Sequence, residues 1–314
     1  MAVARIPLRR ERGAGRITAR MNPEAPPRRS QVPPIPAVII SVVSVQGGAA
    51  FAKGLFPAVG TTGTAGLRIG LSAVILFAVF RPALGRLTRA QWSAVVPYGL
   101  VLGAMNLVFY AALRRIPLGL AVTLEFVGPL GLAVCGSRRA VDFVWVLLAG
   151  AGVALITPWR SRGAPVDLAG VALALVAGGL WAAYIVIGGR ASKVLPAGES
   201  VAVGMLFGAL TVLPFAFATG LLHTVTPGLF AQGLAVALLS SAVPFTLEMM
   251  ALRVLPARTF GILMSMEPAV AALCGLLFLH EQLTPTQWLA LLFVSAASAG
   301  TTLTSRNPAP PTEV

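Results

Sequence analysis

Five charged side chains stand inside otherwise apolar stretches of this chain: Lys53, Arg68, Glu125, Glu248 and Glu267. A charge in hydrocarbon is costly, so such residues usually face one another or a water-filled cavity and mark the pathway of a solute or ion. Carboxylates can bind protons or an ammonium group, and the basic side chains can bind a carboxylate. The five residues therefore predict a site that binds a small charged solute and couples it to protons.

Three of the five also have structural interpretations. Lys53 lies near the end of its apolar stretch, where its ammonium group can reach the membrane surface. Arg68 lies one turn into the next stretch and can anchor it at the interface, and Glu248 can pair with Arg253. The other two acids lie near the middles of their stretches, which favours a functional role.

Each central acid has a proline close by. Pro129 follows Glu125 by four residues and leaves the Glu125 carbonyl without its usual helical donor. Pro268 directly follows Glu267 and does the same for the Met264 carbonyl. Kinked helices with free carbonyls are tolerated where they line a polar cavity. The pairing of acid and proline thus predicts two kinked helices that face a wet central site.

Other polar and aromatic residues in the apolar stretches can complete a pocket or serve as helix-packing contacts. They are Gln46, Asn106, Tyr110, Trp181 and Tyr184. Two further prolines, Pro214 and Pro244, are interpreted as ordinary kinks of membrane helices.

Motifs of enzymes and metal sites are missing from the sequence, which has no HExxH, GxSxG or P-loop pattern. The only aspartates, Asp142 and Asp167, stand at loop edges, and the only histidines, His223 and His280, stand at the ends of apolar stretches. We therefore predict no catalytic residue, no cofactor and no metal.

The two cysteines, Cys135 and Cys274, both lie in apolar stretches and fit no CxxC or Cys/His pattern. They are interpreted as small buried hydrophobic residues. We expect them at opposite depths in the membrane, without a disulfide.

The elements that must position these residues are membrane spans. Of the 314 residues, 57% are hydrophobic and 11% are charged, against about 25% charged in soluble domains. A span needs roughly 20 apolar residues. Pairs of glycines four residues apart, at 66/70, 99/103 and 204/208, fit the small-xxx-small pattern and predict close helix crossings. The sequence predicts an all-α polytopic membrane protein with ten transmembrane helices, at 35–56, 64–80, 92–113, 117–135, 143–158, 168–188, 201–222, 229–252, 258–279 and 286–304.

The net charge of +14 does not indicate nucleic-acid binding, because the basic residues are distributed by membrane side. With the N-terminus inside, 18 of the 24 basic residues fall on the inner side and four on the outer side. The positive-inside rule then places both termini in the cytoplasm. Residues 1–34 are expected to be a disordered basic tail, with the true start at Met1 or Met21, and 305–314 a second cytoplasmic tail.

A weak internal repeat organises the spans. Residues 112–136 align with 251–275 without gaps and match at nine of 25 positions, including the terminal Cys-Gly pair. The offset of 139 residues implies two five-helix repeats, at 35–158 and 166–304. Five spans is an odd number, so the second repeat must be inverted, and inverted repeats place a transport site at the membrane midplane.

Several segments resemble a known family: "SVQGGAAFAKGLFPAVG", "PLGLAVTLEFVGPL", "SRRAVDFVWV", "LEMMALRVLPARTFGILMSMEPA" and "EQLTPTQWLA". From about Ala37 to about Leu303 the chain is similar to EamA-type exporters of the drug/metabolite transporter superfamily. The resemblance is specific to the branch that exports threonine and homoserine. The resemblance implies ten helices in inverted repeats, with a cavity built largely by spans 1, 3, 4, 6, 8 and 9.

The leading hypothesis is a proton-coupled secondary exporter of small amino acids in the bacterial inner membrane, acting as a monomer or homodimer. Glu125 or Glu267 can bind the ammonium group of a zwitterion, and Lys53 or Arg68 its carboxylate. Its partners are then the amino acid, protons and the lipid bilayer. The alternatives are export of other metabolites or amphipathic drugs, an intramembrane enzyme, and a passive channel.

Overall fold

The computed structural model describes residues 33–135, 140–156, 166–219, 225–252, 255 and 257–304. All regular structure in these ranges is helical, and three pairs of helices each form one rod across a short break or a wide turn. Counting each pair as one rod, the described chain forms ten rods. They are α1 (Pro34–Gly54), α2 (Phe56–Phe80), α3 (Arg89–Leu113), α4 (Leu118–Glu125) with α5 (Val127–Cys135), α6 (Ala140–Ile156), α7 (Leu168–Val194), α8 (Ala197–Ala218), α9 (Pro227–Ala237) with α10 (Val243–Leu252), α11 (Ala257–Met264) with α12 (Glu267–Leu279), and α13 (Pro285–Thr304).

Each apolar stretch of the sequence falls on one rod, which confirms the all-α fold class. Within the described ranges, six helices are long and apolar enough to cross a membrane, and three shorter apolar helices join them. The two boundaries that differ most from the prediction belong to α2 and α7. α2 begins at Phe56 instead of residue 64, and Gly60, at φ 67°, interrupts it near its start. α7 continues through Gly188 and Gly189 to Val194, and the chain turns only before Pro196.

Side-chain caps fix several helix starts. Thr88 and Gln91 form a capping box at α3, and Thr226 accepts a hydrogen bond from the N–H of Leu229 at α9. Such caps satisfy N–H groups that have no partner within the helix. At α7, one carboxylate oxygen of Asp167 accepts from the N–H groups of Ala169 and Gly170.

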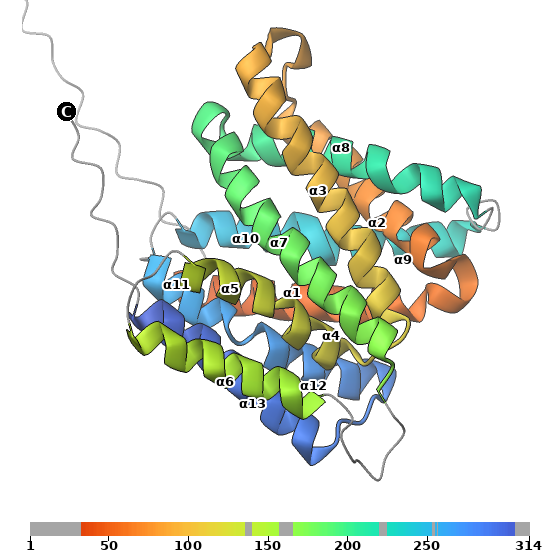
Figure 1. The fold of residues 1–314 in the computed structure, drawn as a ribbon. Helices are drawn as coiled ribbons and strands as arrows, with labels where there is room; N and C mark the ends of the chain where they lie inside the picture. The colour runs from red at the N-terminus through yellow and green to blue at the C-terminus, as the bar shows by residue number, and fades with distance from the viewer. Residues whose placement is uncertain are drawn as a thin grey trace, which may run out of the picture. The chain divides into compact units, whose positions relative to one another are not determined.

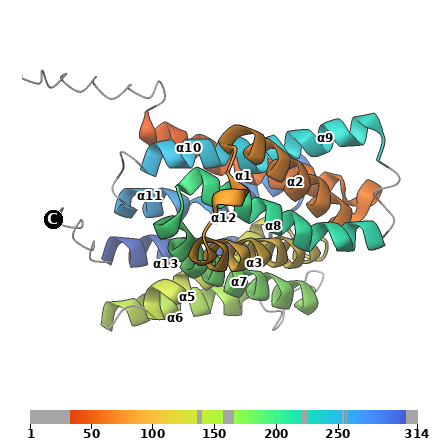
Figure 2. The ribbon, with the colours of Figure 1, turned by 90° about the horizontal axis from the view of Figure 1, so that it is seen from above.

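Helices from the two halves of the chain are interleaved. α3 packs against α7 and α8, α2 against α8, α1 against α10 and α12, and α6 against α13 (Figure 1). The α6–α13 pair lies side by side in the second view as well (Figure 2). α3 and α7 are antiparallel, because Gln91 near the start of α3 bonds the carbonyl of Val194 at the end of α7. The site must therefore be built jointly by both halves.

Glycines allow α3 and α8 to cross at close range. A Cβ atom at Gly99 would collide with the carbonyl oxygen of Gly204, and one at Gly103 would lie 2.7 Å from that of Gly208. These are two of the small-xxx-small pairs noted in the sequence, and here they face each other across one crossing.

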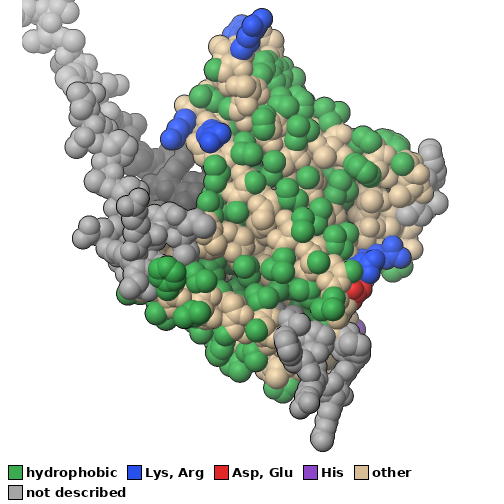
Figure 3. Space-filling view, viewed as in Figure 1, with side chains coloured by type: hydrophobic (Ala, Val, Ile, Leu, Met, Phe, Trp, Pro, Cys, Tyr) green, Lys and Arg blue, Asp and Glu red, His purple; other side chains and the backbone are tan. Residues whose placement is uncertain are grey.

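The outer surface is apolar over the helices. Figure 3 shows hydrophobic side chains over much of the face in view, while lysine and arginine side chains gather at its margins. Large hydrophobic side chains that point outward include Val74, Phe143, Leu147, Val176 and Leu277. An exposed apolar belt with charges at its edges is the surface that a lipid bilayer covers.

Candidate functional site

A cavity of about 270 Å³ lies among the rods. Its volume is near the lower end of ligand pockets, so it suits a small solute. Of the ten side chains that the sequence pointed to, eight line it: Gln46, Arg68, Asn106, Glu125, Trp181, Tyr184, Glu248 and Glu267. The other two lie elsewhere. Tyr110 is fully buried behind Arg68, and Lys53 lies at one end of the bundle.

Three acids border the cavity from three different helices. Glu267 is buried and accepts a hydrogen bond from the side-chain amide of Gln46 at 3.3 Å. Glu248, on α10, accepts one from the hydroxyl of Ser41 at 2.5 Å. Glu125 is also buried, and no described residue donates a hydrogen bond to its carboxyl. The described acids do not group as metal ligands would, so they can act as separate binding points around the cavity.

The two central acids stand at helix breaks. Glu125 is the last residue of α4, and Phe126 separates it from α5. Glu267 is the first residue of α12, with two residues between it and the end of α11 and with Pro268 in the first turn. A helix dipole stabilises a carboxylate at a helix start and destabilises one at a helix end. The two acids are therefore not equivalent, although both border one cavity.

The break after α4 rests directly on the backbone of α7. A Cβ atom at Gly178 of α7 would meet the carbonyl oxygen of Glu125, and one at Gly128 would collide with the Gly178 carbonyl. Backbone therefore lies on backbone at this point, and glycine is required. The contact fixes the position of Glu125 from outside the cavity.

The two broken rods are antiparallel. α4 starts beside the segment that follows α12, because the N–H of Leu118 donates to the Glu281 carboxylate at 2.7 Å. Further along, Gly119 of α4 lies against Ala272 of α12. The rods that carry the two central acids thus contact each other while running in opposite directions.

Arg68 lies mid-helix in α2, not at its edge, and borders the cavity. One terminal nitrogen, Nη1, donates to Asn106 at 3.1 Å and to the hydroxyl of Tyr110 at 3.2 Å. The other, Nη2, donates to the carbonyl of Ser240 at 3.3 Å. The guanidinium group is therefore held in place as a fixed positive charge.

Aromatic rings form another part of the wall. Tyr184 stacks on Tyr98 with ring centroids 4.9 Å apart, and their hydroxyl oxygens are 2.8 Å apart. Trp181 meets Phe126 edge to face, also at 4.9 Å. Phe126 is the residue at the α4–α5 break, so this aromatic contact positions the break as well as the cavity wall.

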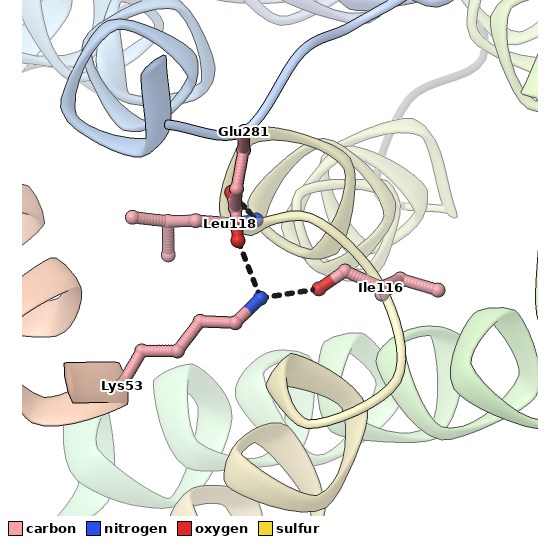
Figure 4. Close-up of polar contacts among 4 residues, drawn as sticks. All are labelled: Lys53, Ile116, Leu118 and Glu281. Carbon is pink, nitrogen blue, oxygen red and sulfur yellow. Dashed lines mark hydrogen bonds and ion pairs between the residues drawn. The ribbon is translucent and has the colours of Figure 1, made fainter. Parts of the chain in front are cut away.

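Lys53 belongs to a polar cluster outside the cavity lining, here called the Lys53 clamp and made of Lys53, Ile116, Leu118 and Glu281 (Figure 4). The ammonium nitrogen of Lys53 donates to Glu281 at 2.6 Å and to the carbonyl of Ile116 at 2.8 Å. The N–H of Leu118 donates to the second carboxylate oxygen of Glu281. The clamp ties the end of α1 and the start of α4 to the segment after α12.

A second ion pair lies at the same end. Arg115 donates to Asp167 at 2.9 Å, and this hydrogen bond, with those from Ala169 and Gly170, holds the pKa of the Asp167 carboxyl below its usual range. Both ion pairs found in the described chain therefore join a residue before 120 to one after 160. They connect the two halves at one end only, here called the Lys53 end.

The remaining sequence-based assignments fall partly outside the described residues. Cys274 is buried and carries a free thiol, while the side chain of Cys135 lies outside them, as do Arg253 and residues 1–32. Sequence reasoning missed Glu281 and Ser240. Glu281 stands in a loop, where a charge is ordinary. Ser240 had one available signal, since Pro244 lies four residues later and frees its carbonyl.

A helical bundle with an apolar outer surface and a small, charged internal cavity defines the class of polytopic membrane transporters. Residues 168–303 match the EamA-like transporter family. The chain is 50% identical over 278 residues to the threonine/homoserine exporter RhtA of Escherichia coli K12, which covers 87% of this chain and 92% of that protein. RhtA of Salmonella typhimurium LT2 is 49% identical over 277 residues, with the same coverage.

More distant proteins agree on the fold. The uncharacterized transporter YwfM of Bacillus subtilis is 27% identical over 245 residues, covering 74% of this chain and 82% of that protein. One crystal structure matches with a TM-score of 0.56 at 19% identity, over 85% of this chain and 95% of the other, and it bears on the fold alone. This chain belongs to the EamA-like transporter family, as a relative of the threonine/homoserine exporters.

Proposed function

We propose that this protein exports small amino acids such as threonine and homoserine from the bacterial cytoplasm, by proton-coupled alternating access. One observation carries the proposal. A cavity of about 270 Å³, shared by both halves of the chain, is bordered by one fixed arginine and three acids, two of which, Glu125 and Glu267, are buried. The name of the relatives that share half of its residues gives the substrate class.

The charges suit a zwitterion. A free amino acid brings an ammonium group and a carboxylate at a fixed short separation, and each group needs an opposite charge once water is removed. Glu267, Glu248 and Glu125 supply acceptors for the ammonium group, and Arg68 supplies a cation for the carboxylate. The side-chain oxygen of Gln46, whose nitrogen donates to Glu267, can accept a hydrogen bond from a substrate hydroxyl.

Alternating access is supported by the two broken rods and by the Lys53 clamp. Antiparallel rods with an acid at each break are what an inverted repeat predicts, with repeats at 35–158 and 166–304. The clamp joins the halves at one end, so its rupture is the step that opens that end. The cavity extends away from the clamp. Its lining includes Leu76, Val201 and Glu248, which lie in the parts of their rods that are farther from the Lys53 end.

The orientation follows from charge. Arg81, Arg89, Arg190 and Lys193 lie at the end opposite to the Lys53 clamp, at or near the ends of α2, α3 and α7. Together with the basic N-terminal segment, they support an orientation in which that end and both termini face the cytoplasm. The Lys53 end then faces the periplasm, which makes the clamp the exit gate of an exporter in the inner membrane.

Proton coupling is assigned to Glu267. The residue is buried, borders the cavity and has one amide partner in Gln46, so either a proton or a substrate ammonium group can satisfy its carboxyl. Exchange between the two on opposite sides of the membrane would drive antiport. Glu125, at the break of the other rod, is the second site for a proton or substrate.

A broader transporter of metabolites or amphipathic drugs is the alternative within the family. Amino-acid profiling separates the two. Deleting the gene should raise intracellular threonine and homoserine, and overexpression should raise both compounds in the medium. Unchanged pools of both, together with altered resistance to lipophilic cations, would refute amino-acid export and support the alternative.

A further inference from the structure

The rod formed by α9 and α10 contains a wide turn beside the cavity. Residues Leu238–Ala242 form a π-helix, here called the π turn. Pro244 has no N–H, so the carbonyl of Ser240 lacks its helical donor. Side chains from neighbouring helices take over: Ser44 donates to the carbonyl of Leu239 at 2.7 Å, and Arg68 donates to that of Ser240. Single π turns in α-helices are frequent at functional sites.

Two polar atoms at this place have no partner. In the described part of the chain, three buried side-chain atoms lack a hydrogen bond: Nε of Arg68, and the hydroxyls of Ser240 and Ser295. The first two residues border the cavity and are joined by the bond from Arg68 to the Ser240 carbonyl. Ser295 lies on α13 and does not border the cavity. A buried polar atom without a partner destabilises the structure, so two of them on hydrogen-bonded residues beside one cavity indicate a missing ligand.

We propose that Nε of Arg68 and the hydroxyl of Ser240 together bind the α-carboxylate of the substrate, an inference that rests on the proposed amino-acid export. Both groups donate hydrogen bonds, and a carboxylate accepts from both. The terminal nitrogens of Arg68 are already held by Asn106, Tyr110 and the Ser240 carbonyl. The Nε side of the guanidinium is what remains for a ligand.

Neighbouring residues define which anion fits. Glu125, Glu248 and Glu267 border the same cavity, so a dianion such as a phosphate monoester would be repelled, whereas a zwitterion places its ammonium group toward the acids. Gly48 of α1 lies directly against Ser240, and a Cβ atom there would collide with the hydroxyl. The site therefore recognises the backbone end of a small amino acid and leaves the substrate side chain to the rest of the cavity.

Competition in proteoliposomes tests this assignment. Vesicles holding the full-length protein and unlabelled threonine take up labelled threonine by exchange, and two compounds compete: threonine, and its amino alcohol, in which a hydroxymethyl group replaces the carboxylate. Wild type should prefer threonine strongly. In Ser240→Ala, threonine should compete roughly tenfold more weakly, the factor expected for losing a hydrogen bond to a charged group, while the amino alcohol should be unaffected.

Two further variants complete the test. Ser295→Ala removes the other unpartnered hydroxyl of the described residues and should leave competition by both compounds unchanged. Ser240→Cys keeps the size of the side chain with a weaker donor, so it should give an intermediate loss for threonine, even if Ser240→Ala inserts poorly. The Ser240 variants could leave the relative inhibition by the two compounds unchanged, or weaken inhibition by both equally. Either result would overturn the carboxylate subsite alone. Absence of threonine and homoserine exchange in wild type would overturn the proposed function and the subsite with it.

Discussion

Neutralising Glu281 should open the Lys53 end of the cavity. Glu281→Gln keeps the shape of the side chain but removes the charge that Lys53 faces at 2.6 Å. Removing one partner of a buried ion pair costs about 3–5 kcal/mol, and an exposed pair contributes about 0–1 kcal/mol. The side chains of Lys53 and Glu281 are 18% and 15% exposed, which lies between these two cases. Losing this ion pair should therefore cost about 2 kcal/mol.

That free energy stabilises the closed state relative to a state in which the end is open. Since about 1.4 kcal/mol corresponds to a factor of ten, Glu281→Gln should raise the open population roughly 30-fold. The open population can be measured with a single cysteine introduced at Val45, which borders the cavity. Cys135 and Cys274 are replaced by serine in the same protein. The rate of its reaction with a membrane-impermeant thiol reagent, applied to either side in oriented vesicles, measures access.

The exposed ion pair at the same end is the matched control. Arg115 and Asp167 are 48% and 38% exposed, so Arg115→Gln should change the labelling rate by less than about threefold. Lys53→Met combined with Glu281→Gln should label no faster than the faster single variant, because both remove the same contact. Labelling from the periplasmic side that is equal in wild type and Glu281→Gln would refute the gate.

The other expectations concern the fold and its response to pH. Gly178→Ala should lower the free energy of unfolding by roughly 1–3 kcal/mol, since the added methyl group meets the Glu125 carbonyl. Gly179→Ala has open space around its Cβ position and should be neutral or stabilising by up to about 1 kcal/mol. Equal effects of the Gly178 and Gly179 substitutions would contradict the backbone contact between Gly178 and Glu125. The pKa of Asp167 is lowered on folding, so its contribution to stability is complete at neutral pH and is lost as the pH falls through the acidic range. The gap in melting temperature between wild type and Asp167→Ala should therefore shrink on acidification, and a constant gap would contradict that.

The sequence was informative where the membrane imposes strong constraints. Apolar stretches must be helical, so the rods follow from composition. A buried acid such as Glu125 or Glu267 is rare enough in a span to stand out, and both reach the cavity. The weak repeat predicted opposite directions for their rods but not the contact between them, and the inverted arrangement of the repeats remains a proposal.

Pairings across the fold were not predictable. Lys53 was interpreted as a membrane-surface or substrate group because its partner, Glu281, is 228 residues away in a loop. Ser240 carried no signal beyond Pro244 four residues later, since serine is common in membrane helices. The π turn that places Ser240 depends on packing against α1 and α2. Arg68 looked interfacial because the first turn of α2, before Gly60, was not recognised as helix.

Gradient-driven transport by Glu267→Gln tests the central claim most directly. The amide keeps the shape of the side chain but cannot carry a proton. In proteoliposomes whose lumen is more acidic than the medium, wild type should accumulate labelled threonine above its external concentration. Glu267→Gln should retain threonine exchange and lose accumulation. Accumulation by the variant equal to wild type, with the same pH dependence, would contradict the assignment of proton coupling to this cavity.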